Sequence, residues 1–217
     1  MKEKMKQIWL KIRQYVLIFF IVIVLRIFVF EITLINWHSM EKSFHHWEFV
    51  YVNKLGYSLF IKDFNRGDVV VINSNDGIKN ISYLKRIIGL PEETIKIEEW
   101  IVYIKEKNSQ VFKKLEEDYL SPENYWKTFM DIEKGWAITI EIPKGEYFVM
   151  GDNRMNSSDS RNCFWNCYYK EATHFVKREQ LEGKLLFSFG WFNFKEFKME
   201  VNARGFNIPN EYNYINF

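Results

Sequence analysis

Residues 146–161 read EYFVMGDNRMNSSDSR, and this stretch decides the fold. Its first part, EYFVM at 146–150, is rich in aromatic and β-branched residues and is typical of a strand. From 151 to 161, every residue except Gly151 and Met155 carries a side-chain hydrogen-bonding group. Asp, Asn and Ser side chains bond to the backbone, and Arg pairs with carboxylates. The pattern indicates a strand whose loop fixes other groups in place, with a solvated surface turn as the alternative.

Short runs rich in Val, Ile, Tyr and Phe lie on both sides of this stretch, separated by turn sequences such as Asn75-Asp76-Gly77. The runs are FVYVNKLGY at 49–57, GDVVVIN at 67–73, TIKIEEWIVYIKE at 94–106, AITIEI at 137–142 and KLLFSF at 184–189. They predict a mainly β fold. Residues 107–130 are polar and break the pattern, and we expect them to be helical in part. We therefore expect a β domain in two parts, 31–106 and 144–217, with an inserted subdomain at 107–143.

The chain begins with a basic segment that is followed by an apolar one. Its first thirteen residues hold five Lys or Arg and one Glu, which gives +4. Residues 15–30, YVLIFFIVIVLRIFVF, are apolar apart from Arg26, which lies near one end and can extend toward the headgroups. A helix of that length spans about 24 Å, so flanking residues must complete a crossing of about 30 Å. We predict a single-pass anchor at 15–30, with residues 1–14 in the cytoplasm and the rest outside.

Two other readings of the apolar segment are weaker. A cleaved signal peptide needs a small-x-small site, and EITLINWHSM at 31–40 has no such pair at the required place. A buried core helix fits the length, but the segment is apolar all round. The aromatic residues near the membrane exit and near the chain end suit an interfacial belt or a core: Trp37, Phe44, Trp47, Phe49, Phe187, Phe189, Trp191, Phe192 and Phe194. The expected partner is thus a lipid bilayer, and with a net charge of +2 we expect no nucleic acid.

The nucleophile search begins with motifs that the sequence lacks: GxSxG, HExxH, GxxxxGK and CxxC. Three of the four histidines crowd around Ser39, where sequence neighbours rarely have the geometry of a base and its nucleophile. A lysine can serve as base instead, if burial lowers its pKa. Lys85 lies in the apolar run ISYLKRIIGLP at 81–91, where strand alternation puts it on one face with Tyr83 and Ile87. The alternative for Lys85 is a charge on an edge strand.

Four blocks, taken in order, resemble the bacterial type I signal peptidases, membrane-bound Ser/Lys proteases that remove signal peptides from exported proteins. The blocks are RIFVFEITLINWHSM at 26–40, RGDVVVI at 66–72, YLKRIIGLPEETI at 83–95 and GDNRMNSSDSR at 151–161. The last matches the family's GDNR-x-NS-x-DSR pattern at every specified position. The resemblance implies Ser39 as nucleophile and Lys85 as general base. It also implies that Met40 packs beside the site and that the Ser157 hydroxyl orients the lysine.

Further supporting roles follow from the same resemblance. Asp159 and Arg161 are expected to form an ion pair, and Tyr83 and Asp152 to support the site. No metal or organic cofactor is implied. The implied substrates are preproteins with small residues before the cut, and secretion machinery is a further candidate partner.

The chain departs from the family around the nucleophile. Trp37 stands where the family carries Ser or Gly, so the oxyanion would rely on backbone donors such as the Ser39 N–H. Lys42 stands in place of a proline. These departures leave two alternatives open: a Ser/Lys protease with a narrow set of clients, or a catalytically silent relative that binds preproteins.

Two cysteines lie in the segment RNCFWNCYYK at 161–170. In an exported domain, Cys163 and Cys167 can oxidise to a disulfide. With His174 they form an incomplete zinc set, which is the weaker reading.

Overall fold

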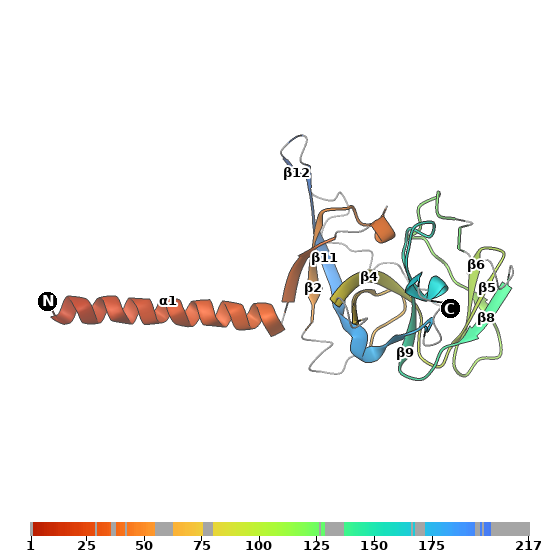
Figure 1. The fold of residues 1–217 in the computed structure, drawn as a ribbon, viewed down its shortest axis with the longest axis horizontal. Helices are drawn as coiled ribbons and strands as arrows, with labels where there is room; N and C mark the ends of the chain where they lie inside the picture. The colour runs from red at the N-terminus through yellow and green to blue at the C-terminus, as the bar shows by residue number, and fades with distance from the viewer. Residues whose placement is uncertain are drawn as a thin grey trace.

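The computed structural model describes residues 2–28, 30–35, 38–41, 43–54, 63–75, 80–125, 127–128, 137–165, 167, 172–193, 196 and 198–200. A single long helix, α1 (Lys2–Phe28), projects from a body made of strands (Figure 1). The mainly β fold is therefore confirmed.

Helix α1 is long and apolar enough to cross a membrane over Lys2–Leu25, and none of that segment is buried against the rest of the chain. It differs from the expected anchor at both ends. It begins thirteen positions earlier than residue 15 because Lys, Arg, Gln and Met are good helix formers and continue it through the basic segment. It ends at Phe28, since Phe30 already pairs with Asn53 in the first strand.

The larger sheet has eight antiparallel strands, in the order β1-β2-β11-β3-β4-β9-β10, with β12 paired to β11. Their bounds are β1 (Phe30–Leu34), β2 (Glu48–Asn53), β3 (Val69–Asn75), β4 (Asn80–Gly89), β9 (Glu146–Met150), β10 (Val176–Lys177), β11 (Leu181–Asn193) and β12 (Lys198–Glu200). Alternate residues of β3 enter different apolar clusters: Val69 and Val71 pack in one, Val70 and Ile72 in another. Burial on both faces explains why this run is continuously apolar.

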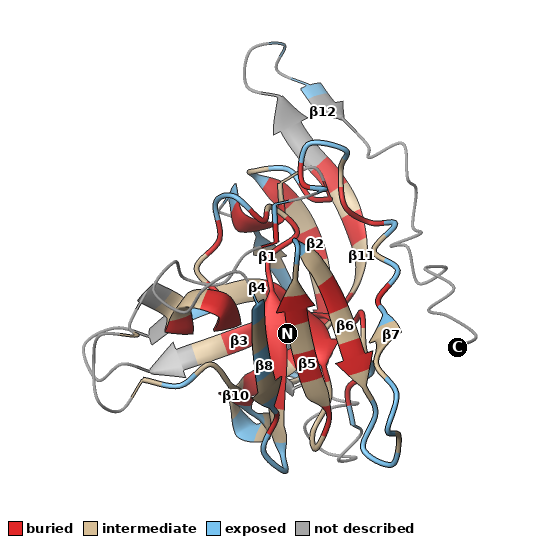
Figure 2. Ribbon diagram, turned by 90° about the vertical axis from the view of Figure 1, so that its right-hand side faces the viewer, coloured by how far each residue is buried: buried red, intermediate tan, exposed pale blue. Residues whose placement is uncertain are grey.

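The smaller sheet has four strands in the order β7-β6-β5-β8. Their bounds are β5 (Thr94–Glu98), β6 (Ile101–Lys105), β7 (Lys113–Lys114) and β8 (Ala137–Glu141). Buried and partly buried residues alternate along β5 and β6, as Figure 2 shows. Their buried side chains, such as Ile95 and Val102, pack with Phe148 and Met150 of β9, so the two sheets share a core.

Two details differ from the sequence-based expectation. The run 94–106 is a hairpin rather than one strand, because Glu99 and Trp100 adopt positive φ values of 49° and 70° and turn the chain. The expected helical part of 107–130 is wrong for the described residues 107–125, which form turns and β7. Backbone pairing with β6 holds only Lys113 and Lys114 of this segment in a strand. The smaller sheet thus joins strands from both sides of residue 107.

Candidate active site

Ser39 lies in a short 3-10 turn, η1 (His38–Met40), that follows β1. Two backbone hydrogen bonds close the loop that carries this turn: Ile35 N–H donates to the Glu48 carbonyl, and Trp47 N–H donates to the Ile35 carbonyl. Met40 is 1% exposed and packs in the apolar cluster of β2 and β3. The buried Met40 side chain therefore anchors the turn to this cluster, while Ser39 is 9% exposed.

Lys85 reaches Ser39 from the middle of β4, 46 positions further along the chain. Its Nζ lies 2.8 Å from Ser39 Oγ and donates a second hydrogen bond to the Leu84 carbonyl at 3.0 Å. The Tyr83 ring lies on the same side, with its centroid 5.4 Å from Nζ. Lys85 itself is 1% exposed. The geometry is that of a base within hydrogen-bond reach of a hydroxyl.

Burial lowers the pKa of Lys85 from 10.5 to about 8. The cause is desolvation, because an ammonium removed from water loses hydration that its surroundings do not replace. The negative charges of Asp159 and Asp152 oppose this effect, and the positive charge of Arg161 reinforces it. A substantial fraction of Lys85 is therefore neutral near pH 8, and only the neutral amine can accept a proton.

The loop after β9 touches the nucleophile turn directly. Asn153 donates twice: its backbone N–H bonds to the Ser39 carbonyl at 3.0 Å, and its Nδ2 bonds to the His38 carbonyl at 2.9 Å. Gly151 lies equally close, since a Cβ at this position would be 2.5 Å from the Ser39 carbonyl oxygen. Sequence reasoning gave neither residue a role. The available signal was a glycine directly after a buried strand and directly before polar residues.

Asp159 and Arg161 brace this loop through a two-pronged ion pair, with Nε–Oδ1 and Nη2–Oδ2 distances of 3.0 and 2.9 Å. Asp159 also accepts the Gly151 N–H at 3.0 Å. Burial alone would raise the pKa of Asp159, but the charge and hydrogen bonds of Arg161, together with the Gly151 N–H, hold it below its ordinary value. Asp159 is therefore a buried carboxylate whose charge is stabilised by the loop around it.

Two further buried ion pairs fix the same loop. Asp152 pairs with Arg86 of β4 at 2.8 and 2.6 Å, and both side chains are almost fully buried. Arg154 pairs with Glu117 at 2.5 Å and also bonds to Thr128 Oγ1. The loop is thus tied to the lysine strand on one side and, through Arg154, to the segment that follows β7 on the other.

Ser157 is close to the site but not bonded to the lysine. Its hydroxyl is buried beside Gly151, and within the described chain it makes no hydrogen bond to Lys85. It lies near the Asp159 carboxylate and contributes to lowering the pKa of that group, without reaching full hydrogen-bond geometry. Trp37 and Lys42, where the chain departs from the family, lie outside the described residues.

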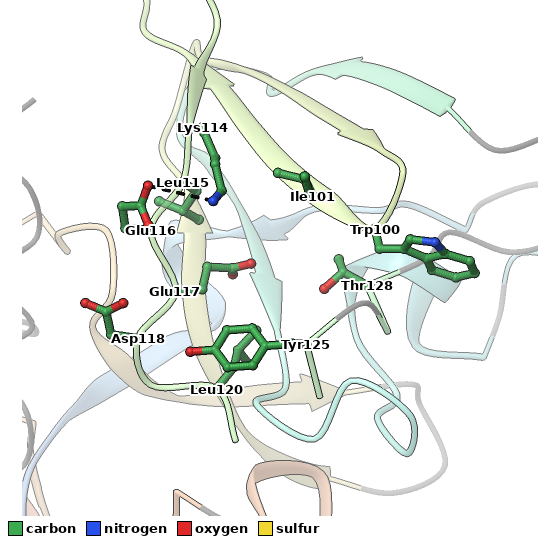
Figure 3. Close-up of a pocket in the computed structure, with 10 residues that line it drawn as sticks. All are labelled: Trp100, Ile101, Lys114, Leu115, Glu116, Glu117, Asp118, Leu120, Tyr125 and Thr128. Carbon is green, nitrogen blue, oxygen red and sulfur yellow. Dashed lines mark ion pairs between the residues drawn. The ribbon is translucent and has the colours of Figure 1, made fainter. Parts of the chain in front are cut away.

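A pocket separate from Ser39 and Lys85 opens over the smaller sheet (Figure 3). Its walls include Trp100, Tyr125, Glu117 and Thr128. Arg154 binds Glu117 and Thr128, which line this pocket. The 151–161 loop, which contacts Ser39, therefore also positions one side of the pocket.

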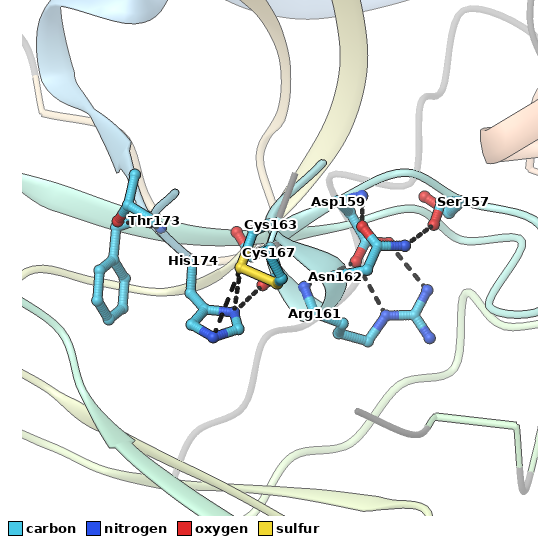
Figure 4. The surroundings of a disulfide bond; sticks show 10 residues. Ser157, Asp159, Arg161, Asn162, Cys163, Cys167, Thr173 and His174 are labelled. Carbon is cyan, nitrogen blue, oxygen red and sulfur yellow. Dashed lines mark hydrogen bonds and ion pairs between the residues drawn. A yellow bond between two sulfur atoms is a disulfide. The ribbon is translucent and has the colours of Figure 1, made fainter. Parts of the chain in front are cut away.

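Of the two readings left open for the cysteines, the structure has the disulfide: Cys163 and Cys167 are joined, with a Cα–Cα distance of 5.0 Å (Figure 4). His174 lies beside them, and its Nδ1 is 2.6 Å from the Ser160 carbonyl. The bridge follows Arg161 by two residues, so it closes the segment directly after the Asp159–Arg161 pair.

Comparison of the sequence with known proteins indicates the family of this chain. The signal peptidase family, peptidase S26, matches residues 8–191. Signal peptidase I T of Bacillus subtilis (strain 168) is 40% identical over 146 residues, which are 64% of this chain and 68% of that protein. Signal peptidase I P of Bacillus subtilis subsp. natto is 37% identical over 169 residues, 74% of this chain and 83% of that protein.

A crystal structure of a signal peptidase I from Enterococcus faecalis V583 is 29% identical and covers 57% of this chain and 97% of that one, with a TM-score of 0.38. The resemblance seen in the four sequence blocks is confirmed by the family match and by the two Bacillus relatives. From these matches, which span most of the chain, it follows that the chain belongs to the signal peptidase family, peptidase S26.

Proposed function

We propose that this chain is a membrane-anchored serine endopeptidase that removes N-terminal signal peptides from preproteins, with Ser39 as nucleophile and Lys85 as general base. The observation that carries the proposal is the 2.8 Å contact between Lys85 Nζ and Ser39 Oγ. Its chemical plausibility comes from the lysine pKa of about 8, which supplies a neutral amine at moderate pH.

In the first half of the reaction, Ser39 Oγ attacks the scissile carbonyl as its proton passes to Lys85 Nζ. The resulting ammonium then gives this proton to the leaving amine, and an acyl-enzyme remains. In the second half, neutral Lys85 takes a proton from water as the water oxygen attacks the ester carbonyl. The ester C–O bond then breaks, and the Lys85 ammonium returns this proton to Ser39 Oγ. The Ser39 backbone N–H is the donor that we assign to the oxyanion.

The edge of β4 beside Lys85 suits an extended substrate. Strand β9 pairs with β4 only from Arg86 onward, so among the described strands the segment 82–85 has a backbone neighbour on the β3 side alone. An extended peptide can add to such an edge by main-chain hydrogen bonds. We assign this edge to the residues that precede the cut, for which the family resemblance implies small side chains.

We further propose that the N-terminus lies in the cytoplasm and the β domain on the outer side of the cytoplasmic membrane. The support is the charge distribution: +4 in residues 1–13, against 24 Lys and Arg and 27 Asp and Glu in residues 31–217, which give −3. Ser39 follows the end of α1 by eleven residues, so the site stays near the bilayer surface, where the end of a signal peptide emerges.

The test uses the full chain in lipid vesicles with a preprotein reporter. Ser39→Ala and Lys85→Ala are each expected to abolish processing, whereas Ser109→Ala and Lys144→Ala, at partly exposed and exposed positions away from the site, keep the wild-type rate. A serine-directed acylating probe is expected to label Ser39 in wild type and to lose its target in Ser39→Ala. Normal processing by either site variant would overturn the assignment.

A panel of preproteins separates a general signal peptidase from one with narrow clients. A general enzyme cleaves most of the panel at rates within about tenfold of one another. Cleavage of one client class alone would replace the general assignment with the specialised one.

A further inference from the structure

Three side chains with metal-binding atoms lie together at the end of the 151–161 loop. The two sulfur atoms of Cys163 and Cys167 and a ring nitrogen of His174 all lie within 4.8 Å of one another. Figure 4 shows the imidazole beside both sulfur atoms. In a tetrahedral zinc site, bonds of about 2.3 Å to sulfur and about 2.0 Å to nitrogen place neighbouring ligand atoms roughly 3.5 to 3.8 Å apart. Cys163 Sγ lies 3.7 Å from His174 Nε2, within this range, and 3.5 Å from Nδ1. A metal on the Nε2 lone pair would place the sulfur about 5 Å from Nδ1, so the ring or the sulfur must move when the site forms.

The Ser160 carbonyl sets the tautomer of the His174 ring. Its Nδ1 is 2.6 Å from the Ser160 carbonyl oxygen. Since a carbonyl only accepts, Nδ1 carries the proton and the lone pair lies on Nε2. Zinc-binding histidines commonly donate their other N–H to a carbonyl or carboxylate, as His174 does here. Nε2 is the nitrogen at 3.7 Å from Cys163 Sγ.

In the structure the two sulfur atoms are joined to each other, and a metal needs them as thiolates. We propose that reduction of the Cys163–Cys167 disulfide converts this group into a Zn²⁺ site, with both sulfurs and His174 Nε2 as ligands and water in the fourth position. Two sulfurs and one imidazole nitrogen select zinc and its soft neighbours over Mg²⁺ or Ca²⁺, which prefer oxygen.

The conversion balances with a dithiol as reductant. The dithiol gives two electrons and two protons to the disulfide, which becomes two thiols, and the dithiol itself closes to a disulfide. Zn²⁺ then displaces both thiol protons to solvent, and its oxidation state does not change. Cys167 and His174 are only partly buried, so reductant and metal can reach the group from solvent.

The disulfide and the proposed zinc site use the same two sulfur atoms, so only one of them can be present at a time. Both connect residues of the same turn. Cys163 belongs to the 3-10 segment η3 (Ser160–Trp165), which also holds Arg161. Within it, Ser160 Oγ accepts the Val149 N–H at 2.9 Å and so fixes the segment to β9. Either a disulfide or a shared metal connects residue 163 to residue 167, so the metal takes over the brace under reducing conditions.

Cobalt(II) is the probe, because thiolate ligands give it an intense charge-transfer absorption and tetrahedral geometry gives strong visible bands. The full chain in detergent micelles is reduced with a dithiol, desalted without oxygen and titrated with Co²⁺. We expect both absorptions to saturate at one cobalt per chain and to disappear when Zn²⁺ is added. Protein left oxidised should show neither. Zn²⁺ should also raise the melting temperature of the reduced chain, which reports on the fold as well as on binding.

Matched variants locate the site. His174→Ala should bind Co²⁺ at least about tenfold more weakly, and the double variant Cys163→Ser, Cys167→Ser should lose the charge-transfer band. His45→Ala, which removes an exposed histidine elsewhere, should bind as wild type does. The proposal is overturned if reduced wild type shows no charge-transfer band, or if His174→Ala binds with unchanged affinity.

Discussion

Gly151 and Ser39 approach so closely that a Cβ atom on residue 151 would lie 2.5 Å from the Ser39 carbonyl oxygen and 2.2 Å from Ser157 Oγ. The first contact is with backbone, which cannot rotate away. We therefore expect Gly151→Ala to push the nucleophile turn away from Lys85 and to lower kcat by at least about tenfold, since a displacement of about 1 Å can cost about 100-fold. Steady-state cleavage of a reporter peptide measures the effect.

The matched control for this variant is Gly145→Ala. Gly145 has a φ of +75° but no atom within 4 Å of the added Cβ, so the substitution strains the backbone without touching the site. Equal losses of kcat in both variants would show that general destabilisation, not the Ser39 contact, is responsible. Gly151→Ala in a Ser157→Ala background removes only the hydroxyl contact, and should stay impaired.

Asn153 is a positioning residue, since its side chain holds the carbonyl directly before Ser39 and touches no reacting atom. Asn153→Ala keeps the backbone bond to Ser39 and loses the bond to His38. We expect kcat to fall about tenfold with KM unchanged. The bond is exposed to solvent, so the free energy of unfolding should fall by less than about 1 kcal/mol. Met155→Ala, at a 57% exposed position of the same loop, should match wild type. A change in KM alone would assign Asn153 to substrate binding instead.

The Ser39–Lys85 pair was within reach of sequence reasoning because each residue lies in a recognisable context: an apolar strand for Lys85 and a family-like block for Ser39. The hydrogen bonds of Asn153 could not be predicted from the sequence. Their acceptors are backbone carbonyls, whose position depends on loop closure by Trp47 and Ile35, and backbone acceptors leave no mark on residue type.

The strand pairing of the smaller sheet could not be predicted for a related reason. Thr94 pairs with Glu141 across 47 positions, and pairing at such separation cannot be read from local periodicity. The hairpin at Glu99 and Trp100 also lacks the Asn-Gly or Asp-Gly pair that marks such turns, although both residues have positive φ.

The cleavage rate should depend on pH through Lys85. Because burial lowers its pKa to about 8, the neutral base predominates above pH 8 and is lost as the pH falls through that value. Under single-turnover conditions, the rate should fall about tenfold per pH unit well below 8 and reach a plateau above it. A rate that stays flat between about pH 6 and about pH 9 would be incompatible with Lys85 as the base.

The lowered pKa of Lys85 also means that burying its ammonium reduces the free energy of unfolding. A pKa of about 8 in the folded chain, against 10.5 for an ordinary lysine, corresponds to about 3 kcal/mol. Below pH 8 the lysine is protonated in both the folded and the unfolded chain, so the full cost is present. Between about 8 and 10.5 the folded chain releases its proton first, and wild type gains stability as the pH rises.

Lys85→Met removes the ammonium while filling a similar apolar volume. We expect it to raise the free energy of unfolding at pH 7 by up to about 3 kcal/mol, although it abolishes cleavage. The gain should shrink as the pH rises from about 8 toward 10.5, because wild type then recovers its own stability. Urea unfolding at pH 7 and pH 9 measures this difference, with Lys144→Met at an exposed position as the variant that should change neither value. If Lys85→Met is less stable than wild type at pH 7, the attraction of the Asp159 and Asp152 charges for the Lys85 ammonium outweighs its desolvation, and the pKa of Lys85 is not lowered as the mechanism requires.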